Sequence, residues 1–256
     1  MTLPSFRAGS ISENPYLPVP PDPYARLRVF CFHHAGGSAS SFARWQPFFG
    51  PTVSVAPVQL PGRERRAREP RVRDVDTLVD ILVGVLGPAL QQPFVFYGHS
   101  MGAALAYRIT VRLGELGLPL PRLLAVGAYP PPHRPVPLAA TAAMPDDELA
   151  QLLVDIGGMS DHLLSYPKWR SAATSLVRDD LALCPAGAEG QPVLSCPVHA
   201  FAGAEDPILP AAEMADWRDY TTADFRLSTL PGGHFFPTQS QTEFLALFAA
   251  VLAGTA

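Results

Sequence analysis

Short apolar segments alternate with longer segments of helical periodicity from Leu27 to the end of the chain. The apolar segments have the length of buried strands, and they lie at residues 27–33, 53–60, 94–98, 123–129, 198–203 and 225–230. Such alternation is typical of βα units, in which a helix connects two parallel strands and covers one face of the sheet. The sequence therefore predicts an α/β fold with a mostly parallel central sheet and flanking helices.

Two of the connecting segments have the apolar spacing of helices that pack on a sheet. After Asp74, a residue type favoured at N-caps, apolar residues recur at i, i+3, i+4 and i+7: Leu78, Ile81, Leu82 and Val85. Near the end of the chain, Ser240 and Glu243 have the spacing of a capping box, and an apolar stripe follows them. Each segment is predicted to be a helix that covers one face of the sheet.

Prolines interrupt the alternation in two places. Residues 130–137 contain five prolines, and about 50 residues of helical pattern without a strand follow them. We expect a helical insertion at about 130–190 that acts as a lid over the strand ends. Residues 1–25 contain six prolines and little periodicity, so we expect an extended lead-in that lies on the surface or is disordered. Residues 26–256 are then expected to form a single domain.

Composition argues against several classes of partner. The chain has 256 residues, 48% of them hydrophobic, which is enough for one sizeable core. Its 19 basic and 23 acidic side chains give a net charge of −4, which argues against a nucleic-acid partner. Because no apolar run reaches the length of about 18 residues that indicates a membrane helix, we expect no membrane partner and a cytoplasmic protein. We also expect it to be a monomer.

Motifs that hold cofactors or metals are missing from the sequence. The three cysteines, Cys31, Cys184 and Cys196, are too widely spaced for a zinc site of the CxxC type. Neither GxxxxGK[ST] nor GxGxxG occurs, and the only lysine, Lys168, lies in the expected insertion. We therefore expect no cofactor and no metal.

The strongest local signal for chemistry is the segment FVFYGHSMGAALAY. Here an apolar strand runs into Gly98-His99-Ser100-Met101-Gly102, and a helical pattern starts at once. This is the strand–turn–helix context in which G-x-S-x-G exposes a nucleophilic serine, because glycines on both sides remove Cβ atoms that would clash in the sharp turn. The alternative is a tight turn with an incidental serine.

A serine nucleophile needs a base and an acid that orients the base. His234, in LPGGHFF, lies between the last predicted strand and the terminal helix, where the order Ser, Asp, His places the base. Asp206, in GAEDPILP, follows the strand at 198–203 and is the expected acid, with Glu205 as the alternative. Two other histidines, His33 and His34, end an early strand but fit that order poorly.

An oxyanion hole requires two backbone N–H groups that point at the tetrahedral intermediate. Met101, the residue after the nucleophile, supplies one of them in this kind of elbow. The other is expected from the loop after the first strand, which has small residues; we assign Ala35, with Gly36 as the neighbouring choice.

Six arginines lie within residues 63–73, RERRAREPRVR. A solvated surface loop is the simpler interpretation of such a run. The alternative is that some of these arginines bind an acidic partner surface or a phosphate near the mouth of the pocket, where planar guanidinium groups would serve well.

Five motifs in the same order, FHHAGGSASSF, QLPGRERRAREP, GHSMGAALAY, GAEDPI and GGHFF, resemble those of the type II thioesterases that accompany polyketide and nonribosomal peptide synthases. The resemblance extends from about residue 27 to 252. It implies an α/β-hydrolase fold with a helical lid, and hydrolysis of acyl groups from the phosphopantetheine arm of acyl or peptidyl carrier proteins. It also implies Ser100 as nucleophile, His234 as base, Asp206 as orienting acid, and Ala35 and Met101 as oxyanion donors.

Three alternatives stay open beside this interpretation. Acyltransferases of the malonyl type share GHSxG, but they lack the later GxxDP and GGH motifs. An esterase of small metabolites would use the same triad. A binding module without activity would usually lack one member of the triad, and all three are present here.

Overall fold

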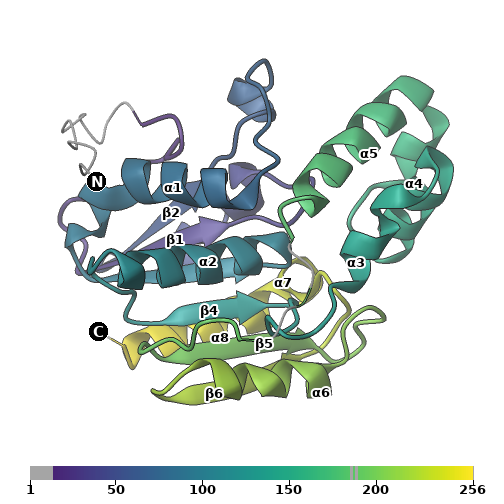
Figure 1. Ribbon diagram of the computed structural model, residues 1–256. Helices are drawn as coiled ribbons and strands as arrows, with labels where there is room; N and C mark the ends of the chain where they lie inside the picture. The colour runs from purple at the N-terminus through teal and green to yellow at the C-terminus, as the bar shows by residue number, and fades with distance from the viewer. Residues whose placement is uncertain (1–13, 185–186, 188–189, 256) are drawn as a thin grey trace.

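The computed structural model describes residues 14–184, 187 and 190–255, and its centre is a six-stranded sheet (Figure 1). The strand order is β2-β1-β3-β4-β5-β6, and every pair of neighbours is parallel. The strands are β1 (Leu27–Phe32), β2 (Val53–Val58), β3 (Phe94–His99), β4 (Leu124–Gly127), β5 (Val198–Gly203) and β6 (Phe225–Leu230). All six lie where the sequence predicts them, with ends that shift by no more than a few residues.

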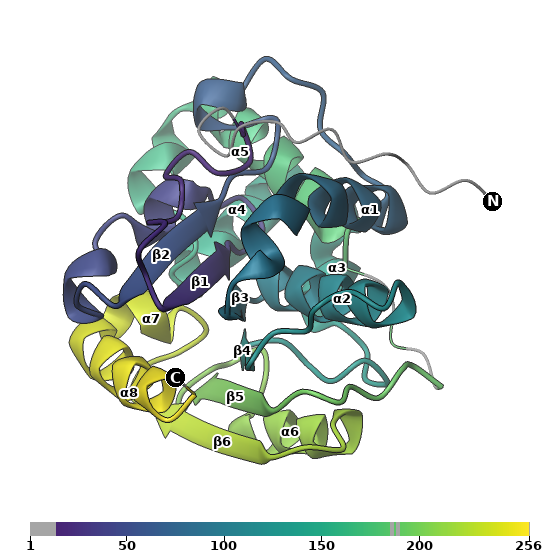
Figure 2. The same ribbon diagram turned by 90° about the vertical axis from the view of Figure 1, so that its left-hand side faces the viewer.

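Helices cover both faces of the sheet and separate the core into two clusters of buried side chains (Figure 2). One face carries α1 (Val75–Leu86), α2 (Met101–Glu115), α6 (Ala211–Met214) and η8 (Ala215–Tyr220). The other carries α8 (Gln241–Ala253), with α7 (Phe236–Gln239) and the short turns η2 (Ala39–Phe42) and η3 (Gln46–Phe48). Two more turns, η4 (Glu64–Arg66) and η5 (Gly87–Gln91), flank α1. No helix among the described residues has the length and hydropathy to cross a membrane.

The two helix starts that the sequence predicts behave differently. Asp74 caps α1, since its side chain accepts a hydrogen bond of 2.8 Å from the Thr77 N–H. At α8, Ser240 is the N-cap residue but its side chain caps nothing, because its hydroxyl donates to the Pro231 carbonyl at 2.9 Å. The prediction of a capping box there is wrong, although the helix itself is present.

A helical insertion lies between β4 and β5, and its described residues form five elements. They are α3 (Pro137–Ala140), η6 (Thr141–Ala143), α4 (Asp146–Asp155), η7 (Asp161–Ser165) and α5 (Pro167–Leu181). Figure 1 shows α3, α4 and α5 beyond the carboxyl ends of the strands, at the edge of the sheet where β3 leads into α2. The predicted helical character of this region is therefore confirmed.

Most of the proline-rich lead-in, residues 1–13, lies outside the described residues. The part that is described packs on the domain: Tyr16 and Leu17 are buried. The Asn14 amide donates to the Val85 carbonyl of α1 at 2.6 Å, and the Tyr16 carbonyl accepts from the Gln59 N–H at 2.9 Å. Residues 14–17 thus extend the core at the C-terminal end of α1.

Candidate active site

Ser100 occupies the sharp turn between β3 and α2. Its backbone has φ 53° and ψ −122°, a conformation that a residue with a side chain rarely adopts. A Cβ on Gly98 would lie 2.1 Å from the Gly102 carbonyl oxygen, and a Cβ on Gly102 would lie 2.0 Å from the Phe32 carbonyl oxygen of β1. The turn can therefore form only with glycine at both positions.

Ser100, His234 and Asp206 form a continuous chain of hydrogen bonds. His234 Nε2 lies 3.2 Å from Ser100 Oγ, and His234 Nδ1 lies 2.8 Å from Asp206 Oδ2. All three side chains are buried. With Nδ1 protonated and donating to the carboxylate, Nε2 is free to accept the serine proton. The other carboxylate oxygen, Asp206 Oδ1, accepts from the N–H groups of Ile208 and Leu209, so the acid is held in place by its own turn.

The alternative acid and bases lie elsewhere. Glu205 is exposed, whereas Asp206 is buried against the imidazole. His33 Nδ1 lies 2.8 Å from the His34 carbonyl oxygen, and the His34 ring packs edge-on against Phe235. Burial lowers the pKa of both His33 and His34 to about 3, so both are neutral at pH 7. Of these three histidines, only His234 reaches Ser100.

His99 contacts the backbone of the triad histidine, His234, and nothing in the sequence indicated this contact. Its Nε2 lies 2.9 Å from the carbonyl oxygen of His234, so the imidazole donates to the backbone of the triad histidine. Burial holds the pKa of His99 well below its usual value, which keeps the ring neutral. The x position of G-x-S-x-G thus anchors the loop that carries His234.

The loop after β1, residues 34–37, is here called the oxyanion loop. Its Gly36 N–H donates to Asp180 Oδ2 at 2.7 Å and is therefore already engaged. This favours Ala35 over Gly36 as the donor from this loop. Met101 stands at the N-terminus of the 15-residue helix α2, where backbone N–H groups and the helix dipole favour negative charge.

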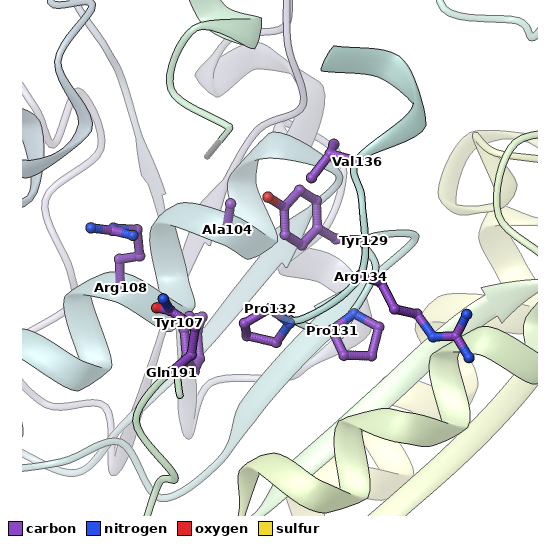
Figure 3. Close-up of a pocket in the computed structure, with 9 residues that line it drawn as sticks. All are labelled: Ala104, Tyr107, Arg108, Tyr129, Pro131, Pro132, Arg134, Val136 and Gln191. Atoms are coloured by element: carbon purple, nitrogen blue, oxygen red, sulfur yellow. The ribbon is translucent and has the colours of Figure 1, made fainter. Parts of the chain in front are cut away.

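The cavity beside Ser100 is small and largely apolar. Its volume is about 10 Å³, close to the minimum that holds one water molecule. Side chains of the insertion, among them Leu138, Leu181 and Cys184, line it. A second cavity of about 30 Å³ adjoins it (Figure 3), and Tyr129 and Val136 line both.

Four of the six arginines at 63–73 form ion pairs within the chain, and the expectation of a solvated loop is wrong for the two that are buried, Arg63 and Arg66. Arg63 is buried and pairs with Asp180. Arg66 is buried and pairs with Glu69. The Arg66 guanidinium also stacks on the Tyr16 ring, 3.9 Å from its centroid. Two others, Arg71 and Arg73, bind Asp179. Arg65 and Arg68 are exposed. The partners on α5, Asp179 and Asp180, lie more than 100 residues from these arginines in sequence, so sequence patterns could not predict the pairs.

The sheet order, the elbow after β3 and the loops after β5 and β6 together define the α/β-hydrolase class, as predicted. Within that class the chain belongs to the thioesterase family, because the family model for the thioesterase domain matches residues 27–251. Its fold class, its resemblance to type II thioesterases and its identification as a thioesterase are thus confirmed. Among the described residues, no group of His, Cys, Asp or Glu side chains is arranged to hold a metal.

Individual relatives agree with this assignment. RedJ, a thioesterase of the prodiginine pathway of Streptomyces coelicolor, is 35% identical with a TM-score of 0.82, over 88% of this chain and 90% of RedJ. BorB, a type II thioesterase from the borrelidin biosynthetic cluster, is 31% identical with a TM-score of 0.77, over 90% of this chain and 93% of BorB. The human medium-chain S-acyl fatty acid synthase thioesterase is 32% identical, over 84% of this chain and 82% of its own length.

Proposed function

We propose that this thioesterase hydrolyses acyl groups from the phosphopantetheine arm of acyl or peptidyl carrier proteins, and so removes aberrant or stalled chains from a polyketide or nonribosomal peptide synthase. The observation that carries the proposal is the hydrogen-bonded chain Ser100–His234–Asp206 in a chain of the thioesterase family. Relatives such as RedJ and BorB, whose names place them in biosynthetic pathways, support this choice of substrate.

In the proposed reaction, Ser100 Oγ attacks the thioester carbonyl while His234 Nε2 takes the hydroxyl proton. The tetrahedral oxyanion is stabilised by the backbone N–H groups of Ala35 and Met101. Asp206 holds the imidazole in the required tautomer and stabilises the imidazolium. Collapse of the intermediate expels the phosphopantetheine thiol, which takes the proton from His234. Water then attacks the acyl-enzyme while His234 Nε2 takes its proton, and the second intermediate collapses as that proton returns to Ser100 Oγ and the acid is released.

Access of the acyl chain requires the insertion to move. A cavity of about 10 Å³ cannot hold an acyl chain, since each methylene occupies a volume comparable with that of a water molecule. Displacement of Tyr129 and Val136 would join the two neighbouring cavities and lengthen the apolar chamber beside Ser100 (Figure 3). The insertion therefore acts as a lid in this proposal, and its apolar inner wall binds the acyl chain.

The test is intact-mass analysis of a panel of acyl-carrier proteins, with chains of graded length, after incubation with the enzyme. We expect loss of the acyl mass with the wild type, and a rate lower by about 10³-fold or more with Ser100→Ala. Ser171→Ala, an exposed serine on α5, is the matched control and should hydrolyse like the wild type.

Other outcomes would favour the alternative functions. If Ser100→Ala keeps most of the activity, the nucleophile is wrong. If the wild type cleaves p-nitrophenyl esters well but leaves the carrier thioesters intact, the protein is an esterase of small metabolites. Transfer of the acyl mass to a second carrier, without hydrolysis, would identify an acyltransferase.

A further inference from the structure

Helix α5 of the insertion contacts the oxyanion loop through buried charged groups that the proposed mechanism does not use. Asp180 Oδ2 accepts from the Gly36 N–H at 2.7 Å and from Arg63 Nη1 at 2.6 Å, and its Oδ1 accepts from Arg63 Nη2 at 2.7 Å. Arg63 Nη1 also donates to the Gly37 carbonyl at 3.2 Å. The ion pair therefore binds an N–H and a C=O of the same loop, and fixes the orientation of the Ala35–Gly36 and Gly37–Ser38 peptides.

The packing of α5 against Gly36 is equally close. Gly36 has φ +77°, and a Cβ at this position would lie 2.7 Å from Val177 Cγ2 of α5. One turn of α5 thus supplies both the surface on which the loop rests and the carboxylate that binds it. The same end of the helix supplies Leu181, which lines the cavity beside Ser100 and His234.

Stability alone does not explain this arrangement. The side chains of Arg63 and Asp180 are only 5% and 2% exposed, and the cost of removing two charges from water commonly cancels their attraction. What a buried, bidentate pair does supply is a fixed geometry, since the guanidinium and the carboxylate can meet in few orientations. We propose that Asp180 is a positioning residue of the active site, which holds the oxyanion loop so that the Ala35 N–H points at the reacting carbonyl.

Because the inference rests on the proposed function, its test must separate the two. The neighbouring residue Asp179 provides a matched control: it binds Arg71 at 2.7 Å and Arg73 at 2.8 Å, so it also ties α5 to the segment before α1, but these contacts do not involve the oxyanion loop. If Asp180 only holds the insertion in place, its variants should have the same effects as the Asp179 variants in every assay. If Asp180 positions the oxyanion loop, the effects of its variants should differ from those of the Asp179 variants.

The experiment measures kcat and KM of the full-length enzyme with an acyl N-acetylcysteamine thioester, which avoids any contribution of carrier docking. It also measures the inhibition constant of an alkyl trifluoromethyl ketone, whose adduct with the serine places an oxyanion in the hole. For Asp180→Ala we expect kcat to fall and the inhibition constant to rise, each by about 10- to 100-fold, with less than about threefold change in KM. Asp179→Ala should change none of these by more than about threefold.

A second pair of variants protects the test against misfolding. Asp180→Asn keeps a side-chain oxygen for the Gly36 N–H but loses charge, so we expect a smaller effect in the same direction, to be compared with Asp179→Asn. Folded Asp180 variants that match the Asp179 variants in kcat and inhibition constant would overturn the inference. If Ser100→Ala is inactive in that case, the proposed function stands; if Ser100→Ala is active, the proposed function itself fails.

Discussion

At the scale of single residues, the elbow at Ser100 shows how far local sequence determines the site. The motif alone predicts that glycines must flank the serine, and the distances at Gly98 and Gly102 confirm the steric reason. The neighbour of Gly102 is nevertheless the Phe32 carbonyl of β1, which meets the elbow only because β1 and β3 are adjacent in the sheet. Local sequence predicts the need for glycine, and sheet order determines what would clash.

Two glycines with opposite surroundings test this account. A Cβ on Gly84, inside α1, meets nothing within 4 Å, so Gly84→Ala should raise the free energy of unfolding by about 1 kcal/mol through helix propensity. Gly102→Ala should lower it by about 1–3 kcal/mol and reduce hydrolysis, because the new methyl displaces the turn that carries Ser100. Urea unfolding curves measure both changes. A stable and fully active Gly102→Ala enzyme would contradict the steric account.

At the scale of elements, periodicity predicts the strands, α1 and the helical insertion well, because each of these patterns is local. It does not predict what the elements bind. The buried pair between Arg63 and Asp180 joins residues 117 apart in sequence. From the sequence alone, the arginine run therefore has the pattern of a solvated loop, because its partner on α5 is not apparent. The failed capping box has a similar origin, since the Ser240 hydroxyl finds the Pro231 carbonyl in the preceding loop.

Arg65 and Arg68 are exposed and lie outside the ion pairs with Asp179 and Asp180, so we expect a carrier protein to contact these two. Figure 1 shows the segment between β2 and α1 beside α5, to which Arg71 and Arg73 join it. Carrier proteins present acidic surfaces, so Arg65→Glu with Arg68→Glu should lower kcat/KM for an acyl-carrier substrate by about tenfold, and more at low salt. Turnover of the N-acetylcysteamine thioester should stay within about twofold.

A double variant elsewhere controls for the change of net charge. Arg26 and Arg122 are exposed and precede β1 and β4, at the end of the sheet opposite the candidate active site. Arg26→Glu with Arg122→Glu should leave both substrates unaffected. Equal losses in the two double variants would mean that net charge, and not a contact with Arg65 and Arg68, determines kcat/KM for the acyl-carrier substrate.

At the scale of the whole molecule, the parallel sheet explains why distant motifs meet. The loops after β1, β3, β5 and β6 all leave the same edge of the sheet, and they carry the oxyanion loop, Ser100, Asp206 and His234 respectively. That convergence can be predicted from the order of the motifs. The shape of the cavity cannot, because part of its wall comes from an insertion that contacts the oxyanion loop through a pair of residues 117 apart in sequence.

Four histidines are kept neutral by burial, and this makes the stability of the whole fold depend on pH. Burial lowers the pKa of His33 and His34 to about 3 and of His199 to about 4, and it holds that of His99 well below its usual value. In the unfolded chain a histidine has a pKa of about 6.5, so below that pH the unfolded state binds protons that the folded state does not. The contribution of these histidines to stability is therefore complete above about pH 6.5, and it is lost as the pH falls toward 4 and then 3.

His199 allows this pH dependence to be measured for one group. Its Nε2 lies 2.8 Å from Ser228 Oγ, and its ring stacks on Phe201, so His199→Gln can keep a hydrogen bond to the serine without a titrating group. Urea unfolding between pH 6.5 and 5, above the usual range of carboxyl groups, should show stability falling with acid in both proteins. The slope should be smaller in the variant by up to one proton, or about 1.4 kcal/mol per pH unit. Equal slopes would mean that His199 takes up its proton in the folded state as readily as in the unfolded one, and that its burial between β5 and β6 does not limit the acid stability of the fold.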